Sequence, residues 1–317
     1  TSYPNTTITI HDFGGDESTR YAAHFKLFNL SAIVTYADCL DMFTSKGWQI
    51  KKDLFVAPYD WRIAPTYSEE FYVQLKELIE LAYTNNDNTK VALFGFSLGG
   101  FLLQQFLSKE VSQEWKDKYV DQAILLSPSF SGSSSSFYYI WKKMSPLIPF
   151  IRTDSLSDLV ESWPFCHVHM PNERAFGNET IAYGPDGEEY KANQLHDLFL
   201  SHKKFRSEMF VKMYNKSRKI LEEEPRELGV KTTIFFNSKN KTPLRYNFSK
   251  GWDKDAEVTY GDGDGSLLAE GIRYVCRKWS NTRCMDFNNS GPDYSHQPQI
   301  SNEYVLGIIS NIILDYE

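Results

Sequence analysis

A glycine-flanked serine at position 97 constrains the fold of this chain more than any other feature of the sequence. Gly95-Phe96-Ser97-Leu98-Gly99 follows the apolar run 91–94, which has the length and the β-branched and aromatic content of a buried strand. Apolar residues then recur at helical spacing over 98–109. The sequence therefore predicts a strand, a sharp turn that carries Ser97, and a helix.

A serine with small residues two positions before and after it, between a strand and a helix, is the nucleophile elbow of the α/β-hydrolase fold. We expect a side chain at Gly95 or Gly99 to clash with neighbouring backbone. The first amide of the helix, that of Leu98, is expected to point to the oxyanion that forms when Ser97 attacks an acyl ester. The alternative is an ordinary tight turn, because such motifs also arise by chance.

The catalytic base is expected near the C-terminus, because the order along the chain in this fold is serine, acid, histidine. Of the seven histidines, only His296 lies there, in the turn-like stretch 290–296 ahead of a helical pattern. We predict that His296 accepts the proton of Ser97. The alternative is a structural histidine, which is the commoner role of a lone histidine.

The acid is expected in the glycine-rich stretch Asp262-Gly263-Asp264-Gly265, whose flexible backbone can aim one carboxylate inward to orient the histidine. Asp264 is preferred, and Asp262 is the alternative. The same stretch is similar to the start of a calcium-binding loop. Such a loop needs a glutamate at its twelfth position, where this chain has Arg273, so we reject that interpretation.

Three segments of the chain resemble the lecithin:cholesterol acyltransferase family, which includes lysosomal phospholipase A2 and the phospholipid:diacylglycerol acyltransferases. They are the hexapeptide Ala57-Pro58-Tyr59-Asp60-Trp61-Arg62, the elbow around Ser97, and the stretch 262–266, which is similar to the family motif D-G-D-G-T. The stretch 115–120 and the helical pattern after His296 also fit. The resemblance implies that Asp264 is the acid.

The chain departs from the family pattern at three places. Phe96 stands where the family has histidine, and Ser266 stands where it has threonine. Family members begin with an apolar strand whose end supplies a second oxyanion amide, whereas this chain opens at Thr1 with a segment that resembles a later family strand. We expect that amino-terminal portion to be absent or retained as a separate chain. Residues 11–14 are then a weak candidate for the second amide.

Strands and helices alternate along much of the sequence, which predicts a mostly parallel sheet with helices on both faces. We expect a hydrolase core formed by residues 1–128 and 231–317, with a cap inserted at 129–230. The serine-rich run 131–136 is interpreted as a flexible bridge into this cap. Strands are predicted at 6–10, 54–57, 91–94, 122–126, 232–236, 257–260 and 284–287, and helices at 30–46, 68–83, 98–109, 266–277 and 302–314.

The aromatic residues of the cap either line an acyl-chain track or pack the cap onto the core, and the sequence leaves both interpretations open. Asp60 and Arg62 are expected to form a structural ion pair. Trp61 and Phe96 are weaker candidates for the wall of a substrate pocket.

Composition excludes some classes of function. A net charge of −7 over 317 residues argues against nucleic acid as a partner. No apolar run approaches the 18 residues or so that a transmembrane helix needs. Neither a metal nor an organic cofactor is implied by the motifs.

Glycosylation sequons and cysteines indicate an oxidising, secretory environment. The sequons exceed the number expected by chance, although an asparagine-rich composition is the alternative. Of the three pairings that four cysteines allow, we favour Cys276–Cys284, which closes a short loop. The expected location is extracellular, or a lysosome-like or vacuole-like compartment. The sequons lie at Asn5, Asn29, Asn178, Asn215, Asn240, Asn247 and Asn288.

These features together predict a serine-dependent hydrolase or acyltransferase that acts on phospholipids through an acyl-enzyme on Ser97. Its expected partners are a phospholipid or other lipid ester and, transiently, a membrane or lipoprotein surface. One alternative is a catalytically impaired or two-chain homologue that binds lipid. The other is an esterase on the same fold that acts on non-lipid substrates.

Overall fold

The predicted nucleophile turn follows the edge strand of a four-stranded parallel sheet. The computed structural model describes residues 10–25, 30–143, 162–202, 205 and 207–314. The strands of this sheet run in the order β10-β7-β4-β3, and all adjacent pairs are parallel. Their bounds are Val91–Phe96 for β3, Val120–Leu126 for β4, Lys231–Phe236 for β7 and Thr282–Asp286 for β10.

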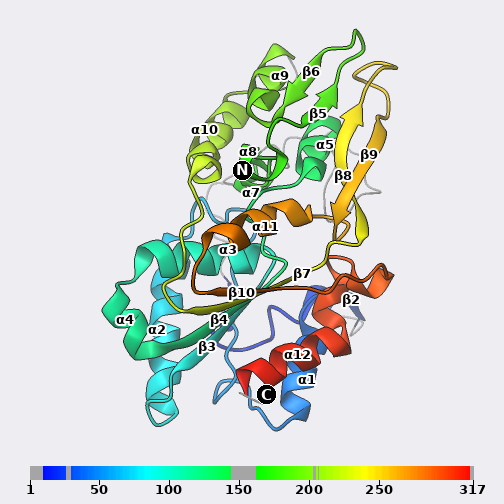
Figure 1. Cartoon of the computed structure of the whole chain (residues 1–317). Coiled ribbons are helices and arrows are strands. Elements are labelled where there is room, and N and C mark those ends of the chain that lie inside the picture. The colour runs from blue at the N-terminus through cyan, green and yellow to red at the C-terminus, as the bar shows by residue number, and fades with distance from the viewer. Residues whose placement is uncertain (1–9, 26–29, 144–161, 203–204, 206, 315–317) are drawn as a thin grey trace.

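Helices cover both faces of this sheet, as the alternation of strands and helices predicts. Successive side chains of β4 point to opposite faces, so Leu125 belongs to one apolar cluster and Leu126 to another. Helices α1 and α12 lie together on one side of the sheet and α3 on the other (Figure 1). The bounds are Ala37–Ser45 for α1, Glu69–Asn85 for α2, Leu98–Gln105 for α3, Ala269–Lys278 for α11 and Glu303–Ile313 for α12.

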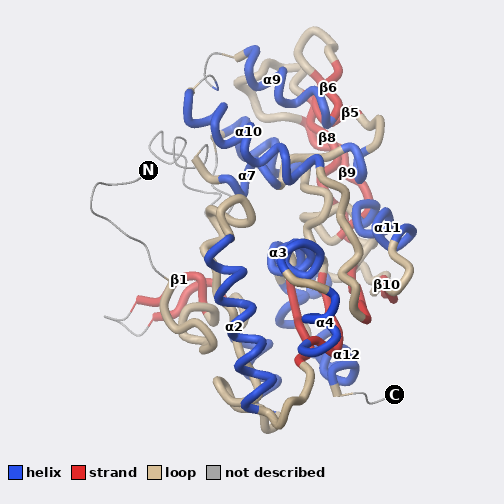
Figure 2. The backbone as a smooth tube through the Cα atoms, turned by 90° about the vertical axis from the view of Figure 1, so that its left-hand side faces the viewer, coloured by secondary structure: helices blue, strands red, loops and turns tan. Residues whose placement is uncertain are grey.

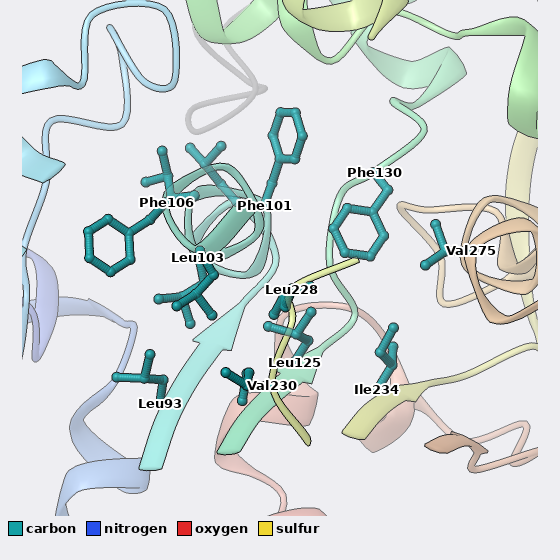
Figure 3. Close-up of a cluster of buried hydrophobic side chains, with 14 of the residues drawn as sticks. Leu93, Phe101, Leu103, Phe106, Leu125, Phe130, Leu228, Val230, Ile234 and Val275 are labelled. Atoms are coloured by element: carbon teal, nitrogen blue, oxygen red, sulfur yellow. The ribbon is translucent and has the colours of Figure 1, made fainter. Parts of the chain in front are cut away.

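The helix that carries the nucleophile turn, α3, is almost completely buried. Leu103 points from α3 toward the strands and shares an apolar cluster with Leu93 of β3 and Ile234 of β7 (Figure 3). The Phe101 ring lies on the other side of the helix and packs against Phe130. A π-helical segment, Phe106–Glu110, continues α3, and α4 follows at Gln113–Tyr119. Dense packing on several sides therefore holds the start of α3 in place relative to the sheet.

A second sheet and most of the remaining helices form the other end of the molecule (Figure 1). The strand order of this second sheet is β6-β5-β8-β9. A largely aromatic cluster of buried side chains lies beneath the sheet. The strands are β5 Thr180–Tyr183, β6 Glu189–Lys191, β8 Asn240–Asn247 and β9 Glu257–Gly263. The helices are α5 Ser134–Lys142, α7 Pro164–Val168, α8 Glu173–Phe176, α9 Leu195–Ser201 and α10 Glu208–Glu222.

Strand pairing in this second sheet crosses the cap boundary expected at residue 230. Strands β8 and β9 follow that boundary in sequence but pair with each other and, through β8, with β5. The strand expected at 257–260 therefore lies outside the parallel sheet, antiparallel to β8. The last residue of β9, Gly263, directly precedes Asp264, so the second sheet positions the acid.

Two expectations for the first sixty residues were wrong. Instead of one helix over 30–46, β1 (Tyr21–Phe25) pairs antiparallel with β2 (Leu30–Val34) before α1 begins (Figure 2). A short apolar run alone does not distinguish a strand from a helix. Within 54–57, Leu54 and Val56 form isolated bridges, and the segment is not a strand of the sheet. Residues 6–9 of the strand expected at 6–10 lie outside the described residues.

The serine-rich run 131–136 is not a flexible bridge. Ser131, Ser133 and Ser134 are buried, and α5 begins within the run. The Ser133 hydroxyl accepts the N–H of Ser135 and donates to the carbonyl of Ser266, which lies beside the acid loop. Because these hydroxyls find partners inside the protein, the run folds into the core instead of remaining solvated.

One disulfide joins the end of α11 to β10. It links Cys276 and Cys284, the pairing favoured from the sequence. Cys39 and Cys166 are buried free thiols. Among the described residues, no helix is long and apolar enough to cross a lipid bilayer.

Candidate active site

Ser97 occupies a strained turn between β3 and α3. Its φ of 52° and ψ of −118° lie in a region that non-glycine residues rarely adopt. Its backbone N–H donates to the carbonyl of Leu126 on β4, 2.9 Å away. This hydrogen bond holds the turn against the neighbouring strand. The residue after Ser97, Leu98, is the first residue of α3.

The two flanking glycines serve different purposes. A Cβ at Gly95 would lie 2.8 Å from the Cα and N of Gly100, which is a clash with backbone, as expected. A Cβ at Gly99 would meet no backbone atom outside its own helix within 4 Å, so the clash expected there was wrong. Its nearest neighbours would be the hydroxyls of Tyr59 and Tyr36, at 3.7 and 3.9 Å. Gly99 therefore leaves open space at the start of α3.

The structure brings Ser97, His296 and Asp264 into one hydrogen-bonded chain. His296 lies between two short 3₁₀ helices, Pro292–Tyr294 and Pro298–Ser301. Its Nε2 is 2.8 Å from Ser97 Oγ, and its Nδ1 is 2.7 Å from Asp264 Oδ2. Asp262, the alternative acid, is exposed on β9 and takes no part in this chain.

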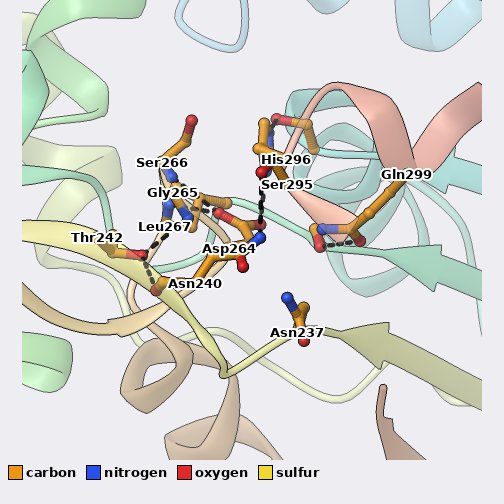
Figure 4. Close-up of polar contacts among 12 residues, drawn as sticks. Asn237, Asn240, Thr242, Asp264, Gly265, Ser266, Leu267, Ser295, His296 and Gln299 are labelled. Carbon is orange, nitrogen blue, oxygen red and sulfur yellow. Dashed lines mark hydrogen bonds and ion pairs between the residues drawn. The ribbon is translucent and has the colours of Figure 1, made fainter. Parts of the chain in front are cut away.

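Asp264 is held in its charged form inside the protein. It is 2% exposed, and its Oδ1 accepts the backbone N–H groups of Ser266 and Leu267 at 3.0 and 2.8 Å (Figure 4). Burial acts to raise the pKa of this carboxyl. The charge of His296 and the hydrogen bonds from His296 and the two amides outweigh burial, so the net pKa is lowered.

A second layer of hydrogen bonds fixes the two loops that carry the acid and the base. Thr242 Oγ1 accepts the N–H of Gly265 at 2.8 Å and donates to the carbonyl of Asn240 (Figure 4). The Asn240 amide donates to the Gly291 carbonyl and to Ser295 Oγ. Strand β8 therefore holds the acid loop and the histidine loop together.

Leu98 is the residue whose N–H the sequence offers as a candidate oxyanion donor. It is the first residue of α3, and the first N–H groups of a helix have no acceptor within the helix. Residues 11–14, the weak candidate for a second amide, do not line the cavity that contains Ser97. The N–H of Gly14 donates instead to the carbonyl of Val56.

A cavity of about 1350 Å³ opens onto Ser97 and His296. Trp61 and Phe96, the two pocket residues expected from the sequence, both line it. The Phe96 ring lies 5.1 Å from the His296 ring, and Trp61 packs edge-on against Trp163 at 5.0 Å. Much of the remaining wall is apolar and comes from α1, α2 and β3, including Leu40, Phe43, Leu75, Ile79, Leu93 and Phe94.

The neighbouring pair Asp60 and Arg62 forms a bidentate ion pair, as expected of a structural role. Arg62 Nε and Nη2 donate to the two Asp60 carboxylate oxygens at 2.8 and 2.6 Å. The pair closes the loop that presents Tyr59 and Trp61 to the cavity.

A second serine–histidine pair beside the site was not foreseen. His169 Nδ1 lies 2.9 Å from the Phe165 carbonyl, which can only accept, so Nδ1 carries the hydrogen. Its Nε2 then accepts the hydroxyl of Ser129 at 2.8 Å, and the N–H of Ser129 donates to the carbonyl of Ser97. Burial lowers the pKa of His169 to about 4. The hydrogen bond to the Phe165 carbonyl acts to raise this pKa, and the nearby His296 acts to lower it. His169 is therefore neutral at pH 7, and no local motif marks it.

The sequons differ in their accessibility. Asn178, Asn215 and Asn288 are exposed, whereas Asn240 and Asn247 are partly buried. The Asn240 amide nitrogen, which a glycan would modify, already donates two hydrogen bonds. Asn5 and Asn29 lie outside the described residues.

Across the described ranges, no group of three or more histidine, cysteine or carboxylate side chains is arranged to hold a metal ion.

The parallel sheet with helices on both faces and the strand–turn–helix at Ser97 give this chain the α/β-hydrolase fold. A solved structure of the Tle4–Tli4 complex superimposes with a TM-score of 0.53 at 12% identity, over 83% of this chain and 69% of that chain. The lecithin:cholesterol acyltransferase family model matches residues 4–222. The chain belongs to that family, as its resemblance predicted.

Curated relatives are similar over most of this chain. The mouse (Mus musculus) lysosomal phospholipase A and acyltransferase is 23% identical over 275 residues, which cover 85% of this chain and 64% of the relative. Mouse phosphatidylcholine-sterol acyltransferase is 24% identical over 279 residues, with 87% and 61% covered. The chain thus spans somewhat less than two thirds of the length of these relatives.

Proposed function

We propose that this chain transfers an acyl group from a phospholipid to water or to an alcohol, through an acyl-enzyme on Ser97. The observation that carries the proposal is the hydrogen-bonded chain from Ser97 through His296 to Asp264 at the wall of a largely apolar cavity. Such a chain supplies a nucleophile, a base and a carboxylate that orients the base. Membership of the acyltransferase family supports a lipid acyl ester as the substrate.

Each residue then has one role in the proposed reaction. Ser97 Oγ attacks the acyl carbon as its proton passes to His296 Nε2, and the carbonyl electron pair moves onto the oxygen. Asp264 stabilises the resulting imidazolium, and the Leu98 N–H donates to the oxyanion. The ester bond then breaks, and His296 protonates the departing alcohol. Water or a second alcohol attacks the acyl-enzyme by the same steps and restores Ser97.

The size and lining of the cavity support an acyl chain as the part of the substrate that is buried. A volume of about 1350 Å³ exceeds the roughly 300–1,000 Å³ of ordinary small-molecule pockets. Apolar residues of α1, α2 and β3 line this cavity, which extends from Ser97 along β3. The names of the mouse relatives, a phospholipase A with acyltransferase activity and a phosphatidylcholine-sterol acyltransferase, agree with phospholipid as the acyl donor.

A secretory location follows from separate observations and is part of the proposal. The Cys276–Cys284 disulfide suits an oxidising compartment, and three sequons lie on exposed residues. One group of relatives is lysosomal by name. We therefore place the protein outside the cell or in a lysosome-like or vacuole-like compartment, in transient contact with a membrane or lipoprotein surface.

The test is incubation of the chain with phospholipid–sterol vesicles, followed by measurement of free fatty acid and of new sterol or other esters. Ser97→Ala is compared with Ser45→Ala, which removes an exposed hydroxyl on α1. A fluorophosphonate probe, which reacts covalently with an activated serine, provides a second readout.

We expect product and probe labelling in the wild type and in Ser45→Ala, and neither in Ser97→Ala. Free acid would identify a phospholipase, and a new ester would identify an acyltransferase. A wild-type chain that binds vesicles but forms no product and takes up no probe would instead be a lipid-binding homologue. Activity on short soluble esters without any gain from vesicles would indicate a non-lipid esterase.

A further inference from the structure

The proposed reaction needs more hydrogen-bond donors to the oxyanion than the one identified above. Oxyanion sites are built from preorganised donors, and the loss of one typically slows the reaction by about 10²–10³-fold. In the ranges that the structure describes, Leu98 N–H is the backbone donor at the elbow, and residues 11–14 do not line the cavity. We therefore searched the cavity wall beside Leu98 for side-chain donors.

Two tyrosine hydroxyls lie at this point. A Cβ built on Gly99 would be 3.7 Å from the Tyr59 hydroxyl and 3.9 Å from the Tyr36 hydroxyl. Both tyrosines line the cavity that contains Ser97, and among the described residues neither hydroxyl has a hydrogen-bond partner. An unpartnered phenol that faces a reaction cavity is available to a substrate oxygen.

The rings that carry these hydroxyls are held in place by other aromatic side chains. Tyr59 packs edge-on against Phe71 of α2 with ring centroids 5.6 Å apart. Tyr36, next to α1, packs edge-on against Phe96 at 6.3 Å. Since the positions of the rings are fixed by packing, the hydroxyls are preorganised rather than recruited when substrate binds.

Gly99 provides the space that such a donor needs. The position that its Cβ would occupy lies between the start of α3 and the two hydroxyls. Hydrogen bonds between hydroxyl groups and oxygen are about 2.5–3.0 Å long. A substrate oxygen about 1 Å closer to Tyr59 than the Gly99 Cβ position is therefore within hydrogen-bond distance of the Tyr59 hydroxyl. Any residue larger than glycine would fill this space with its side chain.

Both phenols stay protonated, as a hydrogen-bond donor must. Burial raises the pKa of Tyr59 well above its ordinary value. Burial also raises the pKa of Tyr36, and the neighbouring Tyr59 and Cys39 raise it further. Both hydroxyls can therefore donate a hydrogen bond at neutral pH.

We infer that the Tyr59 hydroxyl is a catalytic donor to the oxyanion, on the side opposite the Leu98 N–H, with Tyr36 beside it as a positioning residue. The inference rests on the proposed function, because it concerns the intermediate of that reaction. When Ser97 attacks, the carbonyl oxygen gains an electron pair and accepts the Tyr59 O–H hydrogen bond. Tyr59 keeps its proton throughout, and the bond weakens again when the carbonyl re-forms.

The experiment compares Tyr59→Phe and Tyr36→Phe with Tyr72→Phe. Tyr72 is a matched control, because its hydroxyl is buried in α2 and does not line the cavity. Four quantities are measured for each variant: kcat and KM on the vesicle substrate, the rate of fluorophosphonate labelling of Ser97, and the inhibition constant of a boronic acid with an acyl-like chain. The last two probe the tetrahedral, negatively charged state.

We expect Tyr59→Phe to lower kcat and the labelling rate by about 10²-fold with little change in KM, and to weaken boronic acid binding by a similar factor. Tyr36→Phe should have a smaller effect, and Tyr72→Phe none. A folded Tyr59→Phe variant with kcat and labelling within about twofold of wild type would overturn the inference while leaving the proposed function intact. A wild type that is neither active nor labelled would overturn both.

A second variant keeps the test decisive if Tyr59→Phe does not fold. Gly99→Ala adds a methyl group that meets no atom outside its own helix closer than 3.7 Å, so the fold can accept it, but the methyl occupies the space before Tyr59. We expect kcat to fall at least tenfold with the fold retained, as judged by the melting temperature. Unchanged kcat in Gly99→Ala would contradict an oxyanion site in this space.

Discussion

Two hydrogen bonds join Asp264 and His296, which are 32 residues apart in the sequence. The backbone N–H of His296 donates to the carbonyl of Asp264 at 2.7 Å, and His296 Nδ1 lies 2.7 Å from Asp264 Oδ2. The backbone bond fixes the loop, and the side-chain bond fixes the ring. With Nδ1 occupied in this way, Nε2 is left to face Ser97.

Replacement of Asp264 by asparagine should abolish most of the activity while the fold persists. The amide keeps the shape but lacks the charge that stabilises the imidazolium, and it favours the wrong tautomer of His296. We expect kcat to fall by about 10⁴-fold. The measurement is ester hydrolysis and fluorophosphonate labelling, with folding followed by circular dichroism.

Asp262→Asn is the matched control, since it makes the same change two residues earlier on an exposed side chain. It should leave kcat within about twofold of wild type. A large loss in Asp262→Asn together with an active Asp264→Asn would show that the acid had been assigned to the wrong residue.

His169 should make the fold less stable in moderate acid. Its pKa is lowered from 6.5 to about 4 in the folded protein, so the unfolded chain binds a proton first as the pH falls. The stability that depends on neutral His169 is complete above pH 6.5 and is lost as the pH falls toward 4. This difference in pKa corresponds to about 3 kcal/mol at a side chain that is only 5% exposed.

Urea unfolding at pH 7 and pH 4 measures this effect in the wild type and in His169→Gln. We expect the wild type to lose about 2–3 kcal/mol more than the variant over this interval. Equal losses in the two proteins would mean that His169 does not titrate as its burial implies.

Gly95→Ala should damage both the elbow and the stability of the fold. The added Cβ would lie 2.8 Å from the backbone of Gly100, so β3 and α3 must separate and Ser97 must shift. We expect a loss of about 1–3 kcal/mol in the free energy of unfolding. The same shift should reduce kcat by about 10²-fold, because catalysis tolerates little misplacement of the nucleophile.

Gly307→Ala is the contrasting change for this measurement. Gly307 lies within α12, and a Cβ there meets nothing within 4 Å. Because alanine favours the helix, the variant should gain about 0.4–1 kcal/mol and keep its activity. Similar melting temperatures for the Gly95 and Gly307 variants would contradict the clash at Gly95.

Loss of the disulfide should weaken the fold without altering the chemistry. Cys276 and Cys284 close a loop with a sequence separation of 8, for which the chain-entropy model gives about 2–3 kcal/mol. The double variant Cys276→Ala/Cys284→Ala should unfold at lower urea with unchanged kcat. Cys39→Ser is a suitable comparison for the loss of a thiol that forms no bridge. A fall in kcat at full folding would show that the bridge also supports the site.

Local sequence patterns predicted the elements of the core that depend on local interactions. The apolar run 91–94 and the helical pattern after Ser97 correspond to β3 and α3. The patterns at 68–83 and 302–314 likewise correspond to α2 and α12. Periodicity is sufficient in these cases because each element buries one face or, in α3, nearly all of its surface.

Predictions failed where the partner of a segment decides its structure. Residues 30–34 are apolar enough for a helix, but pairing with 21–25 makes them a strand. The serine run 131–136 is polar enough for a loop, yet hydrogen bonds to Ser266 and within the run bury it. The sequence alone does not show which distant segments will pair with such a run.

The sequence by itself determined the elbow at Ser97, the order of the three expected site residues and the family of the protein, because these depend on short motifs and local periodicity. Only the tertiary structure decided that β9 leaves the parallel sheet, that β8 ties the acid loop to the histidine loop, and that the Tyr36 and Tyr59 hydroxyls both lie near Gly99. The physical reason is that each of these contacts joins segments far apart in the chain. Their positions follow from packing and hydrogen bonding across the whole fold rather than from the residues on either side.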